Sequence, residues 1–321
     1  MKTLVAIAIA LMLASGAAAQ PYPSRPVTMV VPFASGGPTD TIARILAEHM
    51  RRLLGQPIIV ENVSGAGGSI GVGRVARATP DGYTLCVGNL SSHVMNGAVY
   101  TLPYDLIADF APIALLSFQP LLIVARKSMP ANDLRELVAW LKANPGKATL
   151  GIQGVGTAGH VFAVFFYTET GTTVQLVPYR GAGPAMQDLV AGQIDFMIDT
   201  PTNSLPQVRG GNIKAYAVTE DARLPSAPEI PTVDEAGLPG FHFSFWQALW
   251  APKETPTNII DKLNSAVVGS LAEATVRQRF AEQGQEIPPP AQQTPKALAA
   301  YHKAEVDKWW PIVKASNIKA E

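Results

Sequence analysis

Two glycine-rich segments near the start of the chain have the composition of anion-binding loops. The first reads Pro-Phe-Ala-Ser-Gly-Gly-Pro-Thr-Asp at residues 32–40, and the second reads Glu-Asn-Val-Ser-Gly-Ala-Gly-Gly-Ser-Ile-Gly at residues 61–71. Glycine lets the backbone approach a ligand closely, and the free amides of a helix N-terminus attract an anion. Ser64 and Ser69 add hydroxyl donors to the second loop. Taken alone, the first segment also fits a plain capped turn between a strand and a helix.

Three further segments have a similar position between a strand and a helix. Residues 154–159 match the dinucleotide pattern G-x-G-x-x-G, but the next strand ends in Val-Pro-Tyr-Arg and lacks the acid that a dinucleotide site needs. The segment serves equally well as the anion-binding start of a helix. Residues 177–185 form another glycine-rich loop, and residues 199–203 follow a further strand.

The second loop also allows a competing interpretation as an esterase. Residues 67–71 match the G-x-S-x-G nucleophile elbow, so Ser69 could act with an acid and with His242 or His302. Such a pattern arises easily in a loop this rich in glycine, and we favour a binding protein that is not an enzyme and has no catalytic residue. The five histidines are scattered and the chain has one cysteine, Cys86, so we expect no metal site and no cofactor. Cys86 is interpreted as a buried apolar residue.

The elements that must position these loops alternate between strands and helices. Strands are predicted in the first half at 27–31, 57–61, 83–88 and 121–125, and further on at 148–152, 174–177, 194–198 and 213–218. Helices are predicted at 40–54, 70–78, 133–144, 159–170 and 184–191, and in the tail at 259–272, 276–283 and 295–315. This rhythm predicts an α/β fold with mostly parallel sheets covered by helices, and it brings the loops to the carboxyl edges of the sheets.

Length and composition favour two lobes in an exported protein. Residues 1–20 have a charged start, an apolar run and an Ala-Ala-Ala cleavage site, which is typical of a signal peptide and predicts the periplasm. We expect residues 21–122 with 248–321 to form one lobe and residues 123–247 the other, joined by two crossings. The formal net charge of +0 gives no basic surface for nucleic acid, and we expect a monomer without direct membrane insertion.

Several of these segments resemble those of a known protein family. Residues 32–40, 60–68, 79–85, 177–181 and 228–237 resemble the signature segments of the Bug family, the extracytoplasmic receptors of tripartite tricarboxylate transporters. The resemblance covers essentially all of the mature chain. It implies a two-lobed type II periplasmic-binding fold in which each lobe is a mixed sheet flanked by helices. The implied ligand is a small carboxylate, namely a di- or tricarboxylate, an acidic amino acid or an aromatic acid. The implied partners are membrane permease subunits or a sensor kinase.

The resemblance and the loop chemistry together give a set of candidate ligand-binding residues. In the first lobe they are Phe33, Ser35, Gly36, Gly37, Asp40, Ser64, Gly67, Gly68 and Ser69. In the second lobe they are Thr157, His160, Arg180 and Asp199. Ala158-Gly159 stands where many family members have serines, which indicates a less polar ligand.

Overall fold

The first of two sheets is built from both ends of the chain. The computed structural model describes residues 21–154, 157–179 and 181–315. The strand order is β2 (Ile58–Asn62), β1 (Val27–Val31), β3 (Thr84–Asn89), β10 (Ser244–Pro252) and β4 (Phe110–Pro120). Strand β1 pairs in parallel with β2 and β3, whereas β10 runs antiparallel to β3 and β4. The late strand β10 therefore lies inside the N-terminal sheet.

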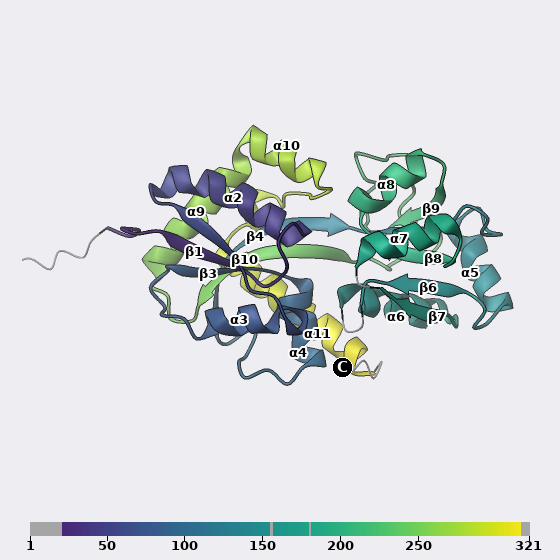
Figure 1. The fold of residues 1–321 in the computed structure, drawn as a ribbon, viewed down its shortest axis with the longest axis horizontal. Helices are drawn as coiled ribbons and strands as arrows, with labels where there is room; N and C mark the ends of the chain where they lie inside the picture. Colours follow the sequence, from purple (N-terminus) through teal and green to yellow (C-terminus); the bar gives the residue numbers. More distant parts are fainter. Residues whose placement is uncertain (1–20, 155–156, 180, 316–321) are drawn as a thin grey trace, which may run out of the picture.

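Helices cover both faces of this sheet (Figure 1). One face carries α2 (Pro38–Leu54), α9 (Thr257–Ala272) and α10 (Ala274–Glu282). The other carries α3 (Ser69–Ala76), the π-helical turn η2 (Ser91–Met95), α4 (Asn96–Val99) and α11 (Pro295–Ala315). Short 3₁₀ turns lie at η1 (Ala66–Gly68) and η3 (Pro290–Gln292). The tail helices thus pack on the first sheet, which their lack of strands predicts.

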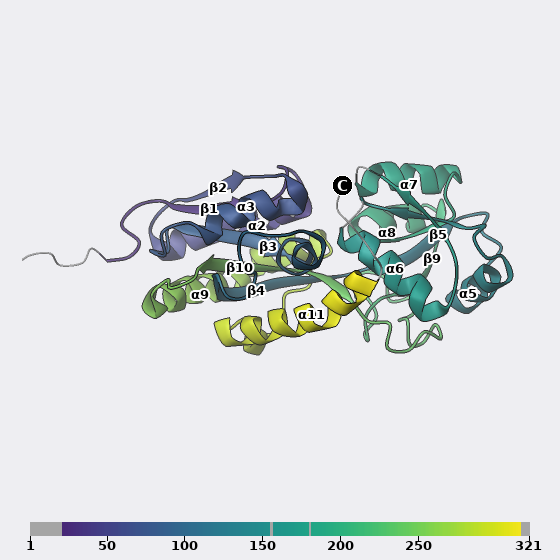
Figure 2. The same cartoon turned by 90° about the horizontal axis from the view of Figure 1, so that it is seen from below.

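The second sheet lies entirely within the middle of the chain. Its order is β7 (Gln175–Pro178), β6 (Thr149–Ile152), β8 (Phe196–Asp199), β5 (Leu122–Arg126) and β9 (Ile213–Val218). Strands β6, β7 and β8 are parallel, and β5 is antiparallel to β8 and β9. Helices α5 (Leu134–Ala143), α6 (Ala158–Thr170), α7 (Ala182–Ala191) and α8 (Pro201–Arg209) flank it (Figures 1 and 2). The predicted fold class, two mixed sheets flanked by helices, is confirmed.

The two sheets are connected by a pair of strands that lie side by side. Strand β4 leaves the first sheet and continues through Leu121 into β5, and β10 returns antiparallel to β4, with Ser244 opposite Pro120. Thr219 joins the two crossings, because its hydroxyl donates to the carbonyl of Phe243 (2.7 Å) and accepts from the amide of Leu121 (3.0 Å). Both crossings therefore form one continuous ribbon between the sheets.

Several described elements were not predicted from the sequence. The predicted strand at 121–125 corresponds to β5, and β4 has no counterpart among the predicted strands. Helix α8 and the η2–α4 turns also fall in segments for which no element was predicted. Strand β4 pairs with β10, which is more than a hundred residues away, so no local sequence pattern predicts this pairing. Helix α8 contains Pro201 and Pro206, which obscure a helical pattern.

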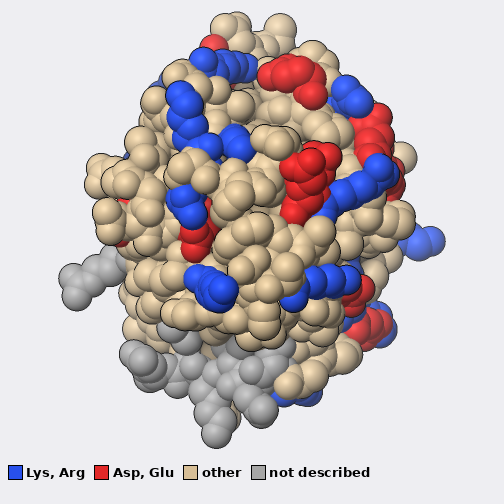
Figure 3. Space-filling view, turned by 90° about the vertical axis from the view of Figure 1, so that its right-hand side faces the viewer, with Lys and Arg blue, Asp and Glu red and all other residues tan. Residues whose placement is uncertain are grey.

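The surface carries both signs of charge in small groups. On the face at the second-sheet end, Lys and Arg side chains lie interspersed with Asp and Glu side chains (Figure 3). This agrees with the balanced composition of 25 basic and 25 acidic residues. Among the helices that the structure describes, none is both long enough and apolar enough to cross a bilayer.

Candidate functional site

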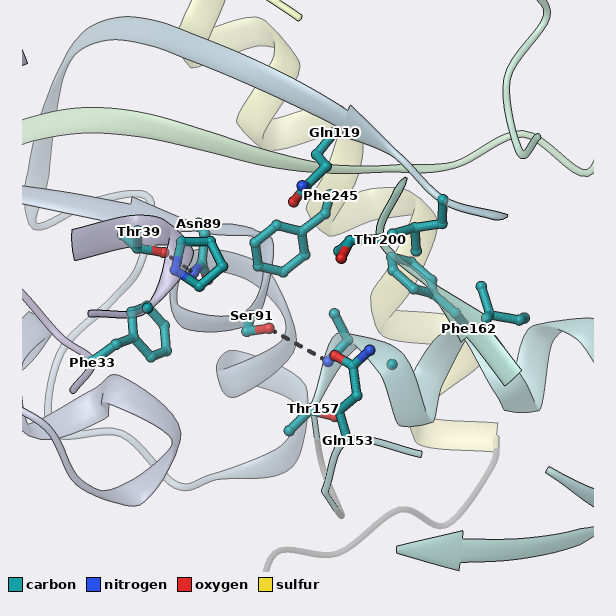
Figure 4. A pocket seen from close by; sticks show the side chains of 16 residues that line it. Phe33, Thr39, Asn89, Ser91, Gln119, Gln153, Thr157, Phe162, Thr200 and Phe245 are labelled. Carbon is teal, nitrogen blue, oxygen red and sulfur yellow. Dashed lines mark hydrogen bonds between the residues drawn. The ribbon is translucent and has the colours of Figure 1, made fainter. Parts of the chain in front are cut away.

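A cavity of about 250 Å³ lies between the two sheets, beside the connecting ribbon. Its first-sheet side is formed by loop and strand-end residues, namely Phe33, Gly37, Pro38, Thr39, Asn89, Ser91 and Gln119. Its second-sheet side is formed by Gln153, Thr157, Ala158, Gly159, Phe162, Ile198 and Thr200. Leu121 and Phe245 from the two crossings complete the lining. Figure 4 shows the side chains converging on this space.

The N-terminus of helix α2 opens onto the first-sheet side of the cavity. The helix begins with Pro38 after an N-cap glycine, Gly37, and its first intrahelical bond runs from the amide of Thr41 to the carbonyl of Gly37 (3.0 Å). The amides of Thr39 and Asp40 precede that bond and have no partner inside the helix. The start of α2 therefore presents backbone donors and a positive dipole end toward the space.

The N-terminus of helix α6 opens onto the same cavity from the second sheet. Thr157 caps it through its hydroxyl, which accepts from the amide of His160 (3.4 Å) and donates to the carbonyl of Gly154 (2.8 Å). The amide of Ala158 donates to the hydroxyl of Ser91, at 3.4 Å, across the gap between the sheets. The amide of Gly159 also lies in the first turn. Two helix N-termini thus face one small cavity.

Among the described lining residues, none carries a formal charge. An anion in this cavity would therefore be neutralised by amides, hydroxyls and helix dipoles rather than by lysine or arginine. Groups of three or more His, Cys, Asp or Glu side chains that could hold a metal ion are also not found among the residues that the structure describes.

Asp40 lies outside the lining and organises the first loop instead. Its buried carboxylate accepts hydrogen bonds from the amide of Gly36 (2.8 Å), the hydroxyl of Ser35 (3.3 Å), Asn62 (2.9 Å) and Arg44 (2.9 Å). Burial would raise the pKa of Asp40, but the hydrogen bonds from Arg44, Gly36 and Asn62 outweigh it and hold the pKa at about 2. Asp40 therefore keeps the β1–α2 loop, including Gly37, in place.

The second glycine-rich loop lies behind the first and outside the lining. Asn62 joins the two, because its amide donates to the carbonyl of Phe33 (3.0 Å) as well as to Asp40. Gly68 has φ of 99°, and a Cβ there would lie 3.4 Å from the Phe33 ring, so a glycine lets Phe33 lie close. Gly67 accepts from Asn96, and Ser64 is exposed. The second loop therefore supports Phe33 from behind.

Of the second-lobe candidates, Thr157 lines the cavity, whereas His160 and Asp199 lie outside the lining. His160 is half-buried in the first turn of α6, where burial lowers the pKa of its imidazole. Asp199 is fully buried behind the lining and accepts hydrogen bonds from Gln153 (2.9 Å), Asn203 (2.6 Å) and Ser204 (3.0 Å). Arg180 lies outside the described residues.

Burial dominates the electrostatics of Asp199. It raises the pKa of the carboxyl from 3.8 to about 6, although hydrogen bonds from Thr200, Asn203, Ser204 and Gln153 act in the opposite direction. Through Gln153 and Thr200, which line the cavity, Asp199 fixes part of the second-sheet side.

Several lining residues were missed by the sequence analysis, although a usable signal existed. Asn89 is the last residue of β3, and Gln153 and Thr200 directly follow β6 and β8. A polar residue at the carboxyl end of an apolar strand reaches the edge where ligands bind in α/β sheets. Gln119 and Phe245 lie opposite each other on β4 and β10, and their position depends on a pairing that the sequence does not reveal.

Known proteins resemble this chain over most of its length. A model of the family described as "Tripartite tricarboxylate transporter family receptor" matches residues 42–318. A UPF0065 protein from the TAR-I ttuE-ttuC' intergenic region of Agrobacterium vitis is 42% identical over 296 residues, which cover 92% of this chain and 86% of that protein.

Solved structures agree with this match. MatC from Rhodopseudomonas palustris, solved with bound malate, has a TM-score of 0.79 and 41% identity and covers 91% of this chain and 100% of its own. The periplasmic binding protein BugD has a TM-score of 0.79 and 40% identity, covering 93% of this chain and 100% of its own. The predicted resemblance to the Bug proteins is confirmed, and the chain belongs to the receptor family of the tripartite tricarboxylate transporters.

Proposed function

We propose that this protein is a periplasmic receptor that captures a small carboxylate in the cavity between its sheets and delivers it to membrane permease subunits. The observation that carries the proposal is the convergence of two helix N-termini, those of α2 and α6, on one cavity. Such termini bind carboxylates through backbone amides and the helix dipole. The related protein MatC was solved with malate, a carboxylate.

The esterase interpretation of Ser69 has no support. The hydroxyl of Ser69 donates to the carbonyl of Ala66 (2.8 Å), which closes the 3₁₀ turn before α3. Its carbonyl accepts from Tyr104 (3.0 Å). The family consists of receptors, not enzymes, as the sequence predicted.

Two groups of residues have different roles in the proposed site. Phe33, Gly37 and Thr157 contact the ligand, together with Thr39 and Ser91, because all five line the cavity. Ser35, Gly36, Asp40 and Gly68 hold the first loop, and Asp199 holds Gln153. Arg180, His160, Ser64, Gly67 and Ser69 stay as predictions for contacts with the ligand.

Capture is proposed to couple to movement of two lobes, residues 21–122 with 248–321 and residues 123–247. A ligand closes the lobes only if it binds the closed form more tightly than the open form. Here the start of α2 belongs to one lobe and the start of α6 to the other, so a carboxylate contacts both only when they are close. We further propose that residues 1–20 are a signal peptide and that the protein is a monomer. A sensor kinase is the proposed alternative to the permease subunits as the partner that recognises the closed form.

A binding assay with paired acids and amides tests the carboxylate proposal. Protein that has been unfolded, dialysed and refolded is titrated with malate, adipate and benzoate by calorimetry, and each acid is compared with its primary amide. At least one acid should bind and stabilise the fold, and its amide should not, because the amide lacks the charge that the dipoles attract. Folded protein that binds none of these acids, or that binds acid and amide equally, would contradict the proposal.

A matched pair of threonine variants locates the site. Thr39 is buried and lines the cavity, whereas Thr41 lies on the same helix outside the lining. Thr39→Val removes one hydroxyl at nearly constant shape and should weaken acid binding about tenfold, because a hydrogen bond to a charged group contributes about 1.5–3 kcal/mol. Thr41→Val should leave the affinity unchanged. Equal effects of the two variants would place the site elsewhere.

A further inference from the structure

We infer that Thr202 latches the two lobes together beside the cavity, and that this contact changes the affinity for every ligand by one common factor. The inference rests on the proposed function, because it requires that capture couples to movement of the lobes. Thr202 belongs to the lobe of residues 123–247, whereas Gln283, which it contacts, belongs to the lobe of residues 21–122 with 248–321. Thr202 is thus a positioning residue, which acts on the ligand through the lobes.

The latch is a hydrogen bond between the start of one helix and the end of another. The hydroxyl of Thr202, the second residue of α8, donates to the carbonyl of Gln283 (2.7 Å), the residue that follows α10. Nε2 of Gln119, at the end of β4, donates to the same carbonyl oxygen (3.1 Å). A carbonyl oxygen has two lone pairs, so this one receives its second donor only when α8 lies against it.

The turn that carries the Gln283 carbonyl is fixed to its own lobe. Glu286 exchanges two backbone hydrogen bonds with Phe118 of β4 (2.7 and 2.8 Å), and the amide of Gln285 donates to the carbonyl of Phe280 (2.9 Å). These bonds tie the turn after α10 to the strand that leads into the ribbon. Movement of α8 away from this turn would therefore break the Thr202 contact and leave the turn in place.

Gly284 allows the two helix ends to lie this close. Its φ is 63°, and a Cβ there would lie 2.8 Å from the hydroxyl oxygen of Thr202 and 3.6 Å from its amide nitrogen. The shorter of these distances is too small for a packing contact between carbon and oxygen. A side chain at position 284 would thus displace the Thr202 hydroxyl from Gln283.

Thr202 lies outside the cavity lining, and its hydroxyl proton is already donated to Gln283. It borders a neighbouring hollow of the surface, together with Pro38 and Gln283. The latch therefore favours the closed form in the same way for any ligand that is confined to the cavity. Because the apparent affinity is the affinity of the closed form reduced by the fraction of protein that is closed, loss of the latch should weaken every ligand equally.

Calorimetry and stopped-flow kinetics on refolded Thr202 variants test the inference with malate, adipate and benzoate. Thr202→Val should weaken each acid that the wild type binds by one common factor of about threefold to tenfold, the range expected for a neutral hydrogen bond. Dissociation should become faster, because opening no longer breaks the latch. Thr202→Ser keeps the hydroxyl and should restore the wild-type affinity and dissociation rate.

The chain contains a closely matched control for this change. Residues 200–203 and 255–258 both read Thr-Pro-Thr-Asn, and each segment lies at the start of a helix. Thr257 is exposed, as Thr202 is, but it borders neither the cavity nor the hollow. Thr257→Val should therefore leave affinity and dissociation unchanged.

A glycine pair gives a second test from the other side of the contact. Gly284→Ala should weaken all bound acids by a common factor, because it pushes Thr202 away from Gln283. Gly211→Ala is the control, since Gly211 has a similar φ of 66° but open space where a Cβ would lie. It shares the backbone strain without the clash and should leave the affinity unchanged.

The outcomes separate the latch from the proposed function. Unchanged affinity of Thr202→Val, with or without a lower melting temperature, or equal effects of Thr202→Val and Thr257→Val, would overturn the inference and leave a carboxylate receptor standing. Weakening of adipate alone would also overturn it, because Thr202 would then contact the longer ligand directly. Binding of no acid by folded wild-type protein would refute the proposed function itself. If Gly284→Ala does not fold, as judged by circular dichroism, the Thr202→Val and Thr202→Ser pair decides the question.

Discussion

The buried carboxyl group of Asp199 gives the protein a measurable dependence of stability on pH. Asp199 is fully buried, and burial raises its pKa from 3.8 to about 6 in the folded state. A carboxyl whose pKa is raised by folding binds its proton more tightly in the folded state than in the unfolded state. Its contribution to stability is therefore complete below pH 3.8 and is lost as the pH rises through about 6.

The size of this effect follows from the shift. Each pKa unit corresponds to about 1.36 kcal/mol, so the full difference of about 2 units is about 3 kcal/mol, of which about 2 kcal/mol is lost between about pH 4.5 and 7.5. The variant Asp199→Asn has nearly the same shape and does not titrate. Subtracting its free energy of unfolding from that of the wild type at each pH removes the other titrating groups.

The assay is equilibrium unfolding in urea, followed by circular dichroism and by tryptophan fluorescence. Trp140 on α5 reports on the second sheet, where Asp199 ends β8. We expect the stability of the wild type relative to Asp199→Asn to fall by about 2 kcal/mol as the pH rises from about 4.5 to 7.5. If that relative stability rises instead, the hydrogen bonds to Asp199 outweigh its burial and the electrostatic argument is wrong.

Three further predictions follow from single contacts. Asp40→Ala removes the acceptor that holds Gly36 and should weaken carboxylate binding about tenfold in calorimetry without unfolding the protein; unchanged affinity would refute its role in the loop. The thiol of Cys86 is buried and its pKa is raised, so Ellman's reagent should react slowly with native protein and at once in denaturant; fast native labelling would contradict the burial. Gly88→Ala would place a Cβ 2.1 Å from Nδ1 of His93 and should destabilise the fold by about 1–3 kcal/mol; an unchanged melting temperature would show that His93 moves aside.

The sequence predicts the local elements well where each element carries its own signal. Helix α2 has a glycine after its last turn and apolar residues at helical spacing, namely Ile42, Ile45, Leu46 and Met50. The sequence therefore predicts both its buried face and its C-terminal end. Strand β1 is a short apolar run bounded by prolines at 26 and 32. In both cases the predicted bounds lie within two residues of those described.

The candidate site was predictable to the level of the loop but not of the side chain. The glycine pattern indicated the start of α2, which lines the cavity, and it gave equal weight to the second loop, which lies behind Phe33. An aspartate in such a loop can face the ligand or hold the loop, and only the positions of Asn62 and Arg44 decide between the two for Asp40. Phe245 enters the cavity through a long-range strand pairing, which no local pattern encodes.

The aromatic contact at the end of α11 makes one side of the cavity harder to open than the other. Trp309 is fully buried and lies edge-on against Phe162, with centroids 5.3 Å apart, although α11 otherwise packs on the first sheet. Separating the sheets there would expose a large aromatic surface to water, and the free-energy cost of that exposure is about 25 cal/mol per Å² of apolar area. On the other side, a hollow bordered by Pro38, Thr202 and Gln283 adjoins the cavity, and one hydrogen bond from Thr202 to Gln283 (2.7 Å) spans it. We therefore expect solvent and ligand to enter and leave the cavity through that hollow, while helix α11 keeps the opposite side closed.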